Sequence, residues 1–446
     1  MRCPFGIPAS CLILGLPVGV ARAQSCPPRW QGFALGGPAS SLYRAPDNLL
    51  YIGGDFTTPA SHIASFSGTS FAPVGDGLDG SVLDIITHDD GSGPRLYVTG
   101  FFGVPAAQNS NLAYARLNGT QFQTYGSTIG PTSWTGHMAS YNFGAGPRLV
   151  VSAPSHMNFC EYIAEWTGTG WQCMADGLAS VTHDSQLFDD GHGLALFCVG
   201  SFVINGGSFQ DSLGIAKWTG SAWLPVGGGL RDGPGYTCEV FDSGEGPELV
   251  VGGHFTRVGP GANWVSARYA ARWNGTRWAA LGTGFNNEVR ALEPFDDGSG
   301  PALYAAGTFT TADGQPAQRL AKWTGTQWLP CPAGGIAAGT IEDLCAFDPD
   351  GPGPAPRRLA IAGTFASVGT TPAMNFATLI ADAGIDFNND GVYPDTQDIN
   401  DFLAVFSGGP CPTQSCNTID FNGDGLFPDT SDIDAFLSVF SGGPCG

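Results

Sequence analysis

One stretch recurs with variations along most of the chain, and this repeat constrains the fold more than any other feature. Its clearest copy spans residues 288–328 and reads EVRALEPFDDGSGPALYAAGTFTTADGQPAQRLAKWTGTQW. Two short, apolar, β-prone segments flank the acidic glycine turn DDGSGP, and two further segments flank the tight turn TGTQ. The copy therefore predicts four antiparallel strands joined by turns and one polar loop.

The same signature returns at similar intervals. A second strand ending in Gly-x-Phe occurs six times, and VVSAPSH at 150–156 occupies this place in one further copy. The third strand carries Ala-x-aromatic-x-Gly with variations, and FATLI at 376–380 is the seventh and last such strand. Four-stranded antiparallel units repeated around an axis are the blades of a β-propeller. The sequence therefore predicts an all-β, seven-bladed β-propeller over residues 24–381.

The fourth strand opens with an aromatic residue, but only six such strands follow a third strand. The missing partner of FATLI is found at the other end of the chain. There, Trp30 in RWQGFALGG has the same form as the fourth-strand segment WLPVGGGL at 223–230. We therefore expect the N-terminal segment to supply the last strand of the seventh blade, which leaves no free radial edge in the ring.

Composition agrees with a turn-rich β protein that can bury a core. Gly and Pro number 67 and 33, and hydrophobic residues reach 42%, whereas disordered chains lack this apolar content. Asp and Glu outnumber Lys and Arg by 39 to 18, which gives a net charge of −21. This charge argues against nucleic acid and against an anionic membrane surface as partners. Beyond the first residues, no apolar run is long enough to predict a membrane span.

Residues 1–23 have the pattern of a secretory signal peptide. Arg2 is followed by an apolar centre at 11–20 and by an Ala-Arg-Ala cleavage site that ends at Ala23. We therefore expect a secreted protein that is extracellular or attached to a cell surface.

Cysteine usage agrees with export. The chain has 12 cysteines, of which ten lie beyond the signal peptide, and an even number in an exported chain permits disulfides. Pairing cannot be derived from the sequence alone. A disulfide is expected near the C-terminus between Cys416 and Cys445, which bracket one loop and helix, with Cys411 as a competing partner.

Near Ala381 the pattern changes, and residues 384–446 contain ten Asp with no Lys, Arg or Glu. This tail is a repeat of its own, in which an acidic loop is followed by an apolar pattern of helical period. We expect two amphipathic helices that bury their apolar stripes against each other. The stripes are Ile399, Phe402, Leu403 and Phe406 in the first copy, and Ile433, Phe436, Leu437 and Phe440 in the second.

Each tail loop begins with D-x-N-x-D-G, which places side-chain oxygens on alternate residues of a tight turn. Hard cations such as Ca²⁺ collect oxygen ligands in this way, with Gly at the sharp bend. The sequence therefore predicts two Ca²⁺ sites, and the alternative is a pair of solvated turns that cap the helices. The first site comprises Asp386, Asn388, Asp390, the carbonyl of Val392 and Asp398, and the second comprises Asp420, Asn422, Asp424, the carbonyl of Leu426 and Asp432.

These loop–helix copies resemble the paired repeats of dockerin modules, which are similar to half EF-hands. The closing Asp falls at position 13 instead of 12, after an inserted Pro394 or Pro428. Asp395 and Asp429, at position 10, are therefore alternative closing ligands. The resemblance implies a calcium-binding module over residues 384–446 with a cohesin-like or cell-surface partner.

The repeats over residues 26–381 resemble kelch-type propellers and the related repeats of fungal cortical polarity-marker proteins. The double glycine after the second strand is present at 53–54 and 252–253. Some kelch-type propellers are copper radical oxidases, but the seven histidines show no paired metal spacing and are interpreted as loop or surface residues. No Ser-His-Asp set stands out, and the recurrent Trp and Phe residues are interpreted as packing between blades.

Two functions are consistent with these patterns. The first is a secreted, non-catalytic binding or structural protein, whose propeller binds a protein or polysaccharide and whose tail attaches it to a surface or scaffold. The alternative is an extracellular carbohydrate-active or other hydrolytic or oxidative enzyme carried on a dockerin-like tail. The first is favoured because no catalytic constellation is visible. The loops at 205–214 and 257–269 differ most between copies and are the expected binding surface.

Overall fold

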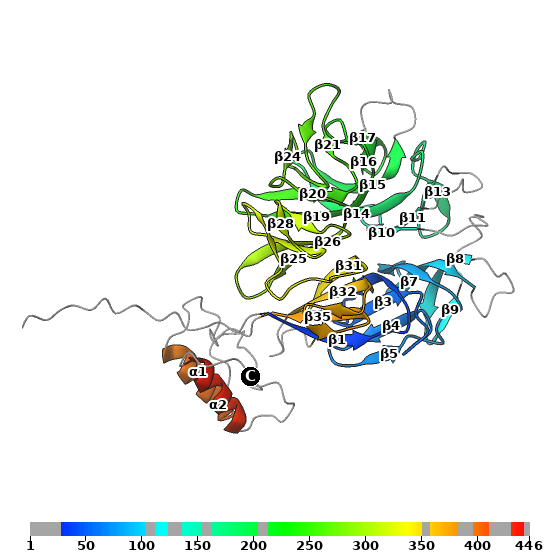
Figure 1. Cartoon of the computed structure of the whole chain (residues 1–446). Coiled ribbons are helices and arrows are strands. Elements are labelled where there is room, and N and C mark those ends of the chain that lie inside the picture. Colours follow the sequence, from blue (N-terminus) through cyan, green and yellow to red (C-terminus); the bar gives the residue numbers. More distant parts are fainter. Residues whose placement is uncertain are drawn as a thin grey trace, which may run out of the picture.

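The computed structural model describes residues 28–103, 112–123, 136–152, 160, 162–203, 213–349, 357–381, 396–409 and 430–440. The expected signal peptide lies outside these residues. Strands dominate the described chain, and two short helices lie near its C-terminal end (Figure 1). The fold is a β-propeller, as the repeat predicts.

Seven four-stranded antiparallel sheets form most of the fold, and in six of them the strands keep their chain order across the sheet. The first two sheets are β2 (Ala39–Arg44), β3 (Leu50–Gly54), β4 (Ile63–Phe66), β5 (Phe71–Pro73), and β6 (Val82–Asp89), β7 (Pro94–Phe102), β8 (Leu112–Asn118), β9 (Gln121–Gln123). The next two are β10 (Met138–Tyr141), β11 (Arg148–Ser152), β12 (Ile163–Trp166), β13 (Trp171–Cys173), and β14 (Thr182–Asp189), β15 (Leu194–Val203), β16 (Leu213–Trp218), β17 (Trp223–Pro225). The fifth and sixth are β19 (Gly235–Asp242), β20 (Pro247–Gly253), β23 (Ala270–Trp273), β24 (Trp278–Ala280), and β25 (Val289–Asp296), β26 (Pro301–Gly307), β29 (Leu320–Trp323), β30 (Trp328–Pro330).

The seventh sheet joins the two ends of the repeat region. It consists of β31 (Thr340–Phe347), β32 (Arg358–Thr364), β35 (Asn375–Ile380) and β1 (Arg29–Ala34). Strand β1 is antiparallel to β35, with Trp30 opposite Leu379. The prediction that the N-terminal segment supplies this strand is confirmed.

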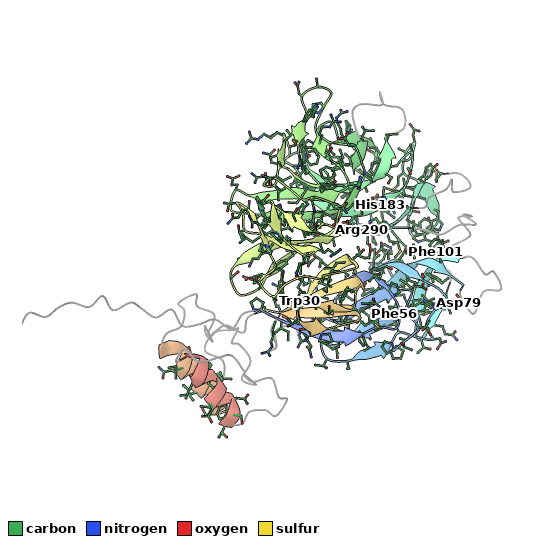
Figure 2. The ribbon with its side chains drawn as sticks, viewed as in Figure 1. Trp30, Phe56, Asp79, Phe101, His183 and Arg290 are labelled. Carbon is green, nitrogen blue, oxygen red and sulfur yellow. A yellow bond between two sulfur atoms is a disulfide. The ribbon has the colours of Figure 1, made fainter. Side chains whose placement is uncertain are left out.

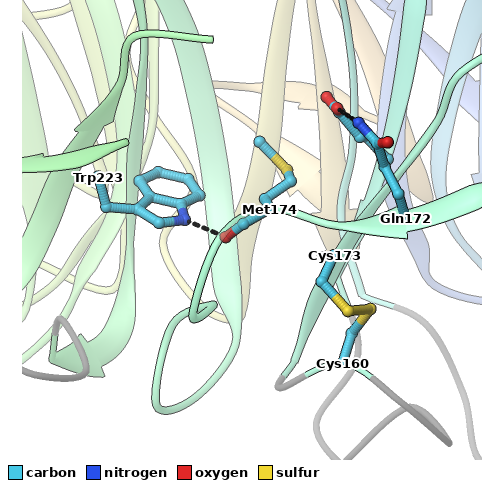
Figure 3. Close-up of a disulfide and its surroundings, with 6 residues drawn as sticks. Cys160, Gln172, Cys173, Met174 and Trp223 are labelled. Carbon is cyan, nitrogen blue, oxygen red and sulfur yellow. Dashed lines mark hydrogen bonds between the residues drawn. A yellow bond between two sulfur atoms is a disulfide. The ribbon is translucent and has the colours of Figure 1, made fainter. Parts of the chain in front are cut away.

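Three of the tryptophans that open fourth strands, Trp30, Trp223 and Trp328, donate a hydrogen bond to the preceding sheet. The indole N–H of Trp223 donates to the carbonyl oxygen of Met174 in the preceding sheet at 2.9 Å (Figure 3). Trp30 donates in the same way to Gly334 at 3.0 Å. Trp30 therefore performs the same structural role as Trp223. The fourth-strand tryptophans also lie in the apolar clusters between sheets, which confirms their interpretation as packing between sheets.

Apolar clusters fill the spaces between consecutive sheets. One cluster, for example, combines Leu50 and Phe66 of the first sheet with Phe347 and Phe376 of the seventh. Six further clusters occupy the remaining junctions between neighbours. The core is therefore divided among the junctions between sheets, and stability depends on each sheet having a neighbour on both faces.

The acidic glycine turns have the predicted chemistry. Asp296 accepts hydrogen bonds from the backbone N–H groups of Gly298 and Gly300, at 3.0 and 2.9 Å. Both glycines have positive φ, at 94° and 101°, which glycine adopts without steric cost. The same pair of bonds recurs at Asp89, Asp189 and Asp242.

A second acidic residue in several of these turns pairs with a cation from the third strand. Asp297 and Lys322 are both almost fully buried, and their charged atoms lie 2.6 Å apart. The hydroxyl of Tyr304 also donates to Asp297, at 2.6 Å. Equivalent pairs are Asp90 with Arg116 and Asp190 with Lys217, each at 2.6 Å.

Short strand pairs form in three of the loops between second and third strands, which the sequence predicts only as polar loops, and β18, between β17 and β19, adds to one of them. They are β18 (Leu230–Arg231) with β21 (Arg257–Val258) and β22 (Val265–Ser266), β27 (Thr311–Ala312) with β28 (Gln315–Pro316), and β33 (Ser367–Val368) with β34 (Thr371–Pro372).

The two helices, α1 (Thr396–Phe406) and α2 (Thr430–Phe440), occupy the predicted segments. The rings of Phe402 and Phe436 stack with centroids 4.2 Å apart, and both side chains are buried. The stripe prediction is wrong for Leu403 and Leu437, which are each 40% exposed. Each leucine follows its buried phenylalanine by one residue and is therefore rotated about 100° around the helix, away from the contact.

A disulfide joins Cys160 to Cys173 at the edge of the third sheet (Figure 3). Four further cysteines in the described residues are buried as free thiols, namely Cys198, Cys238, Cys331 and Cys345. The expected pair of Cys416 with Cys445, and its competitor Cys411, lie outside the described residues.

Candidate functional site

The innermost strands of all seven four-stranded sheets line one cavity of about 630 Å³. These strands are β2, β6, β10, β14, β19, β25 and β31. His183 and Arg290, which both line it, lie near the middle of the propeller in Figure 2. Cavities of several hundred Å³ are typical of sites for small molecules.

Most inner strands have a register shift near their start, as a β-bulge produces. A bulge redirects the side chains that follow it, and the residue after the shift lines the cavity in most strands. His137, the residue before β10, occupies the equivalent position in the third sheet. The residue after it, Met138, pairs with Val151 of β11, just as Ile85, the residue after Asp84, pairs with Val98 of β7. The residues at this position are Ser41, Asp84, His137, Asp184, Thr237, Ala291 and Asp343.

At three of these positions an aspartate links its sheet to the next one around the ring. Each carboxylate accepts a hydrogen bond from a backbone N–H of the neighbouring inner strand, and a second from the residue that follows it. The links are Asp84 with Met138 at 2.7 Å, Asp184 with Cys238 at 2.8 Å and Asp343 with Leu42 at 2.7 Å. These bonds fix the carboxyl groups on the cavity wall.

Burial and mutual repulsion raise the pKa of several acids on this wall. Burial, followed by the charge of Asp184, raises the pKa of Glu239 to about 7. Burial and the charge of Glu239 raise the pKa of Glu293 to about 8. Burial also raises the pKa of Asp343 to about 8, because its two backbone hydrogen bonds only partly offset the loss of solvent. The cavity therefore gains negative charge between mildly acidic and mildly alkaline pH.

The basic groups of the cavity are held by acidic partners. The guanidinium of Arg290 donates to Glu342 at 2.5 Å and to Glu288 at 3.0 Å. His183 differs. Its side chain keeps contact with solvent in the cavity, but desolvation by the surrounding wall and the nearby His137 lower its pKa to about 4. At neutral pH, His183 is therefore an uncharged hydrogen-bonding group, and Arg290 is part of an ion-pair network.

One chain of hydrogen bonds crosses three neighbouring sheets at the cavity wall. A carboxylate oxygen of Asp84 lies 3.0 Å from Nδ1 of His137, and Nε2 of His137 lies 2.9 Å from Oγ of Ser185. The three side chains come from β6, the residue before β10, and β14. We name these residues the channel relay.

The sequence did not reveal the channel relay. His137 and the buried His88 contradict the interpretation of the histidines as loop or surface residues, whereas the side chains of His192 and His254 are 64% and 45% exposed. The recurrent aspartate near the start of several first strands was the available signal. Linear spacing does not show that these strands meet around one cavity.

An exposed aromatic residue occupies one of the loops expected to bind partners. Trp264 is 44% exposed and lies under the guanidinium of Arg257, 5.0 Å from the ring centre. Arg257 is also paired with Asp232. Trp264 is therefore an exception to the interpretation of tryptophans as packing between sheets.

Most of the predicted calcium ligands lie outside the described residues. These are Asp386, Asn388, Asp390, Val392, Asp395, Asp420, Asn422, Asp424, Leu426 and Asp429. Asp398 and Asp432 lie within the first turns of α1 and α2, and the side chain of Asp432 is fully buried. Within the described ranges, no group of three or more His, Cys, Asp or Glu residues is placed to hold a metal ion.

No family model matches the chain, and no curated protein matches it. Among solved structures, it is similar to the extracellular domain of the one component system BT4673 from B. thetaiotaomicron, with a TM-score of 0.47 and 10% identity over 78% of this chain. It is also similar to YCF48 bound to D1 peptide, with a TM-score of 0.46 and 11% identity, and to the WD40 propeller domain of Doa1, with a TM-score of 0.43 and 11% identity. These matches cover 80% and 78% of this chain, and 97% and 96% of the two solved chains.

The chain spans only 39% of the BT4673 domain. At these sequence identities and TM-scores, the similarity to solved structures does not indicate what the protein does. In the part of the chain that the structure describes, no helix is long and apolar enough to cross a membrane.

Proposed function

We propose that the protein is a secreted binding protein whose propeller holds a small polar ligand with a cationic group in its central cavity. The observation that carries this proposal is the charge of the cavity wall. Among the described residues that line it, six are acidic, two are histidines and one is Arg290. The acidic residues are Asp84, Asp184, Glu239, Glu293, Glu342 and Asp343.

A cationic ligand would relieve the repulsion among these carboxyl groups. Glu239, Glu293 and Asp343 have pKa values near neutrality, so a bound cation favours their ionised forms and displaces protons. The affinity for a cation should therefore fall as the pH falls through about 8 to 7, because protonated carboxyl groups lose their charge.

Calorimetric titration of the full chain with choline, whose charge does not depend on pH, tests this proposal. We expect binding at pH 9, proton release at pH 7, and an affinity at least about tenfold lower at pH 5.5. Glu293→Gln and Asp343→Asn should each weaken binding, whereas Glu245→Gln, a change on a side chain that is 79% exposed, should not. Equal binding of choline and of its neutral analogue 3,3-dimethylbutanol would refute the cationic ligand.

We further infer that the seven four-stranded sheets are the blades of a single ring of the kelch-like kind. In support, consecutive sheets share apolar clusters, and β1 joins the last sheet to the N-terminal segment. The double glycines at 53–54 and 252–253 end β3 and β20, as the kelch resemblance leads one to expect.

For the tail, we propose a dockerin-like module that binds two Ca²⁺ ions and attaches the protein to a cohesin-like or other surface partner. Two D-x-N-x-D-G loops support this proposal, as do two helices in the expected places that stack Phe402 on Phe436. Residues 1–23 support secretion. In this arrangement the tail determines where the propeller meets its ligand.

A further inference from the structure

The hydrogen bonds of the channel relay join the same kinds of atoms as those that activate a serine nucleophile. Asp84 faces Nδ1 of His137, and Ser185 faces Nε2 of the same ring. When the carboxylate accepts a hydrogen bond from Nδ1–H, Nε2 carries the lone pair and can accept the hydroxyl proton of Ser185. This is the arrangement in which imidazole acts as a general base toward a serine hydroxyl.

Two other histidine–serine pairs in the same propeller show how specific this arrangement is. Nδ1 of His88 lies 2.9 Å from Oγ of Ser140, and Nε2 of that buried ring has no hydrogen-bond partner among the described atoms. Nε2 of His183 lies 2.9 Å from Oγ of Ser201. Within the described chain, only the pair in the channel relay has a carboxylate hydrogen-bonded to the second ring nitrogen.

The channel relay is enclosed by protein but still in contact with the cavity. All three residues line it, and the side chains of His137 and Asp84 are 14% and 20% exposed. Ser185 itself is half-buried on the cavity wall, so a small substrate and a water molecule can reach it. The cationic part of such a substrate would face the acidic wall, which includes Asp184 beside Ser185.

The charges around His137 determine when it can act as a base. Burial disfavours its protonated form, but the hydrogen bond and charge of Asp84 on β6 and the charge of Asp184 on β14 outweigh burial, so its pKa is raised. His183 on β14 faces it as an uncharged ring at neutral pH. His137 therefore becomes neutral only at a pH above the ordinary pKa of histidine. A reaction that uses His137 as a base should become faster as the pH rises through the pKa of this residue.

We propose that Ser185 and His137, positioned by Asp84, hydrolyse small esters that carry a cationic group. This inference rests on the proposed function, because the same cavity supplies the binding site. Ser185 Oγ forms a bond to the ester carbonyl carbon while its proton moves to His137 Nε2. The bond to the leaving alcohol then breaks, and His137 returns the proton to that alcohol. Water, deprotonated by His137, releases the acid and regenerates Ser185, so ester and water give acid and alcohol.

The experiment uses the purified full chain with diisopropyl fluorophosphate at pH 8.5, followed by peptide mass mapping. We expect one phosphorylated serine, Ser185, and no label on Ser140 or Ser201, which serve as internal controls. Acetylthiocholine should be hydrolysed faster than p-nitrophenyl acetate at equal concentration, relative to their rates in buffer. Ser185→Ala should abolish both labelling and turnover.

Two further variants separate catalysis from a structural link between sheets. His137→Gln should lower turnover by about 10²–10⁴-fold, with an unchanged far-UV circular dichroism spectrum. Asp84→Asn keeps an acceptor for the Met138 N–H and should lower turnover while shifting the midpoint of the pH–rate profile to lower pH, because the anion that raises the pKa of His137 is gone.

Unlabelled Ser185 in folded wild-type protein that still binds choline would overturn the catalytic proposal and leave the proposed binding function intact. Absence of choline binding together with labelled Ser185 would refute the cationic ligand but retain the nucleophile. Equal labelling of Ser140, Ser185 and Ser201 would also overturn the proposal, because the carboxylate would then confer no reactivity.

Discussion

At the scale of single residues, buried charge pairs distinguish this propeller from a purely apolar one. Asp297 is 1% exposed and Lys322 is 7% exposed. The cation compensates for the burial of the carboxylate, and Lys322 also contacts Ser299. Removal of one partner from such a pair leaves a buried charge without compensation, which costs far more than removal of an exposed pair.

Lys322→Ala should therefore lower the free energy of unfolding by about 3–5 kcal/mol, as measured by urea denaturation. Arg257→Ala is the matched control, because Arg257 and Asp232 form an ion pair that is 38% and 35% exposed, and its loss should cost far less than the loss of Lys322. Adding Asp297→Ala to Lys322→Ala should recover part of the loss. Equal costs for the two single variants would contradict this account.

Residue patterns predicted the turns but not the candidate site, for a physical reason. The role of Asp296 depends on glycines two and four residues away, so the local sequence is sufficient to predict this turn. The role of Asp84 depends on His137 and Ser185, which approach it only because three inner strands meet around the cavity. No local rule specifies which side chains of neighbouring inner strands come within hydrogen-bond distance of each other.

At the scale of elements, the sequence predicted the positions of the strands better than it predicted how the two helices pack against each other. The segments FATLI and RWQGFALGG appear in β35 and β1 as the repeat predicts, because apolar residues at fixed repeat positions define each strand. The helices α1 and α2 form where the 3.6-residue period predicts them. Their shared contact is narrower than the stripe, since Phe402 and Phe436 are buried whereas Leu403 and Leu437 are 40% exposed.

The calcium proposal belongs to this scale, because a bound ion would fix the loop that orients each helix. Calorimetric titration of the full chain should show two Ca²⁺ ions bound per molecule. Combining Asp390→Ala with Asp424→Ala should abolish binding, because each change removes a charged ligand from one loop. Asp47→Ala, in a propeller turn, should not alter it. Absence of Ca²⁺ binding to the wild-type protein would show that the loops only cap the helices.

At the scale of the whole molecule, the pairing of β1 with β35 closes the ring. Phe33 of β1 packs in the cluster between the first and seventh sheets, and Trp30 of the same strand packs in the cluster between the sixth and seventh, so this one strand contributes to two junctions. Because each sheet needs a neighbour on both faces, loss of β1 should weaken the propeller as a whole.

Deletion of residues 28–37 should therefore lower the thermal unfolding midpoint by more than 10 °C or cause aggregation, since it exposes a backbone edge on β35. Trp30→Phe, which keeps the strand but removes the indole N–H that donates to Gly334, should cost only about 1 kcal/mol. Scanning calorimetry distinguishes these outcomes. A deletion variant that melts like the full chain would contradict the closure.

Closure by β1 also sets an order of events during synthesis. Residue 34 leaves the ribosome long before residue 375, and at about 5–20 residues per second the interval is on the order of 20–70 s. Throughout that time the first strand made has no partner, while the sheets that follow it can assemble one against another. Strand β1 is therefore the part of the newborn protein that a chaperone, or a second nascent copy of the chain, has the longest opportunity to occupy.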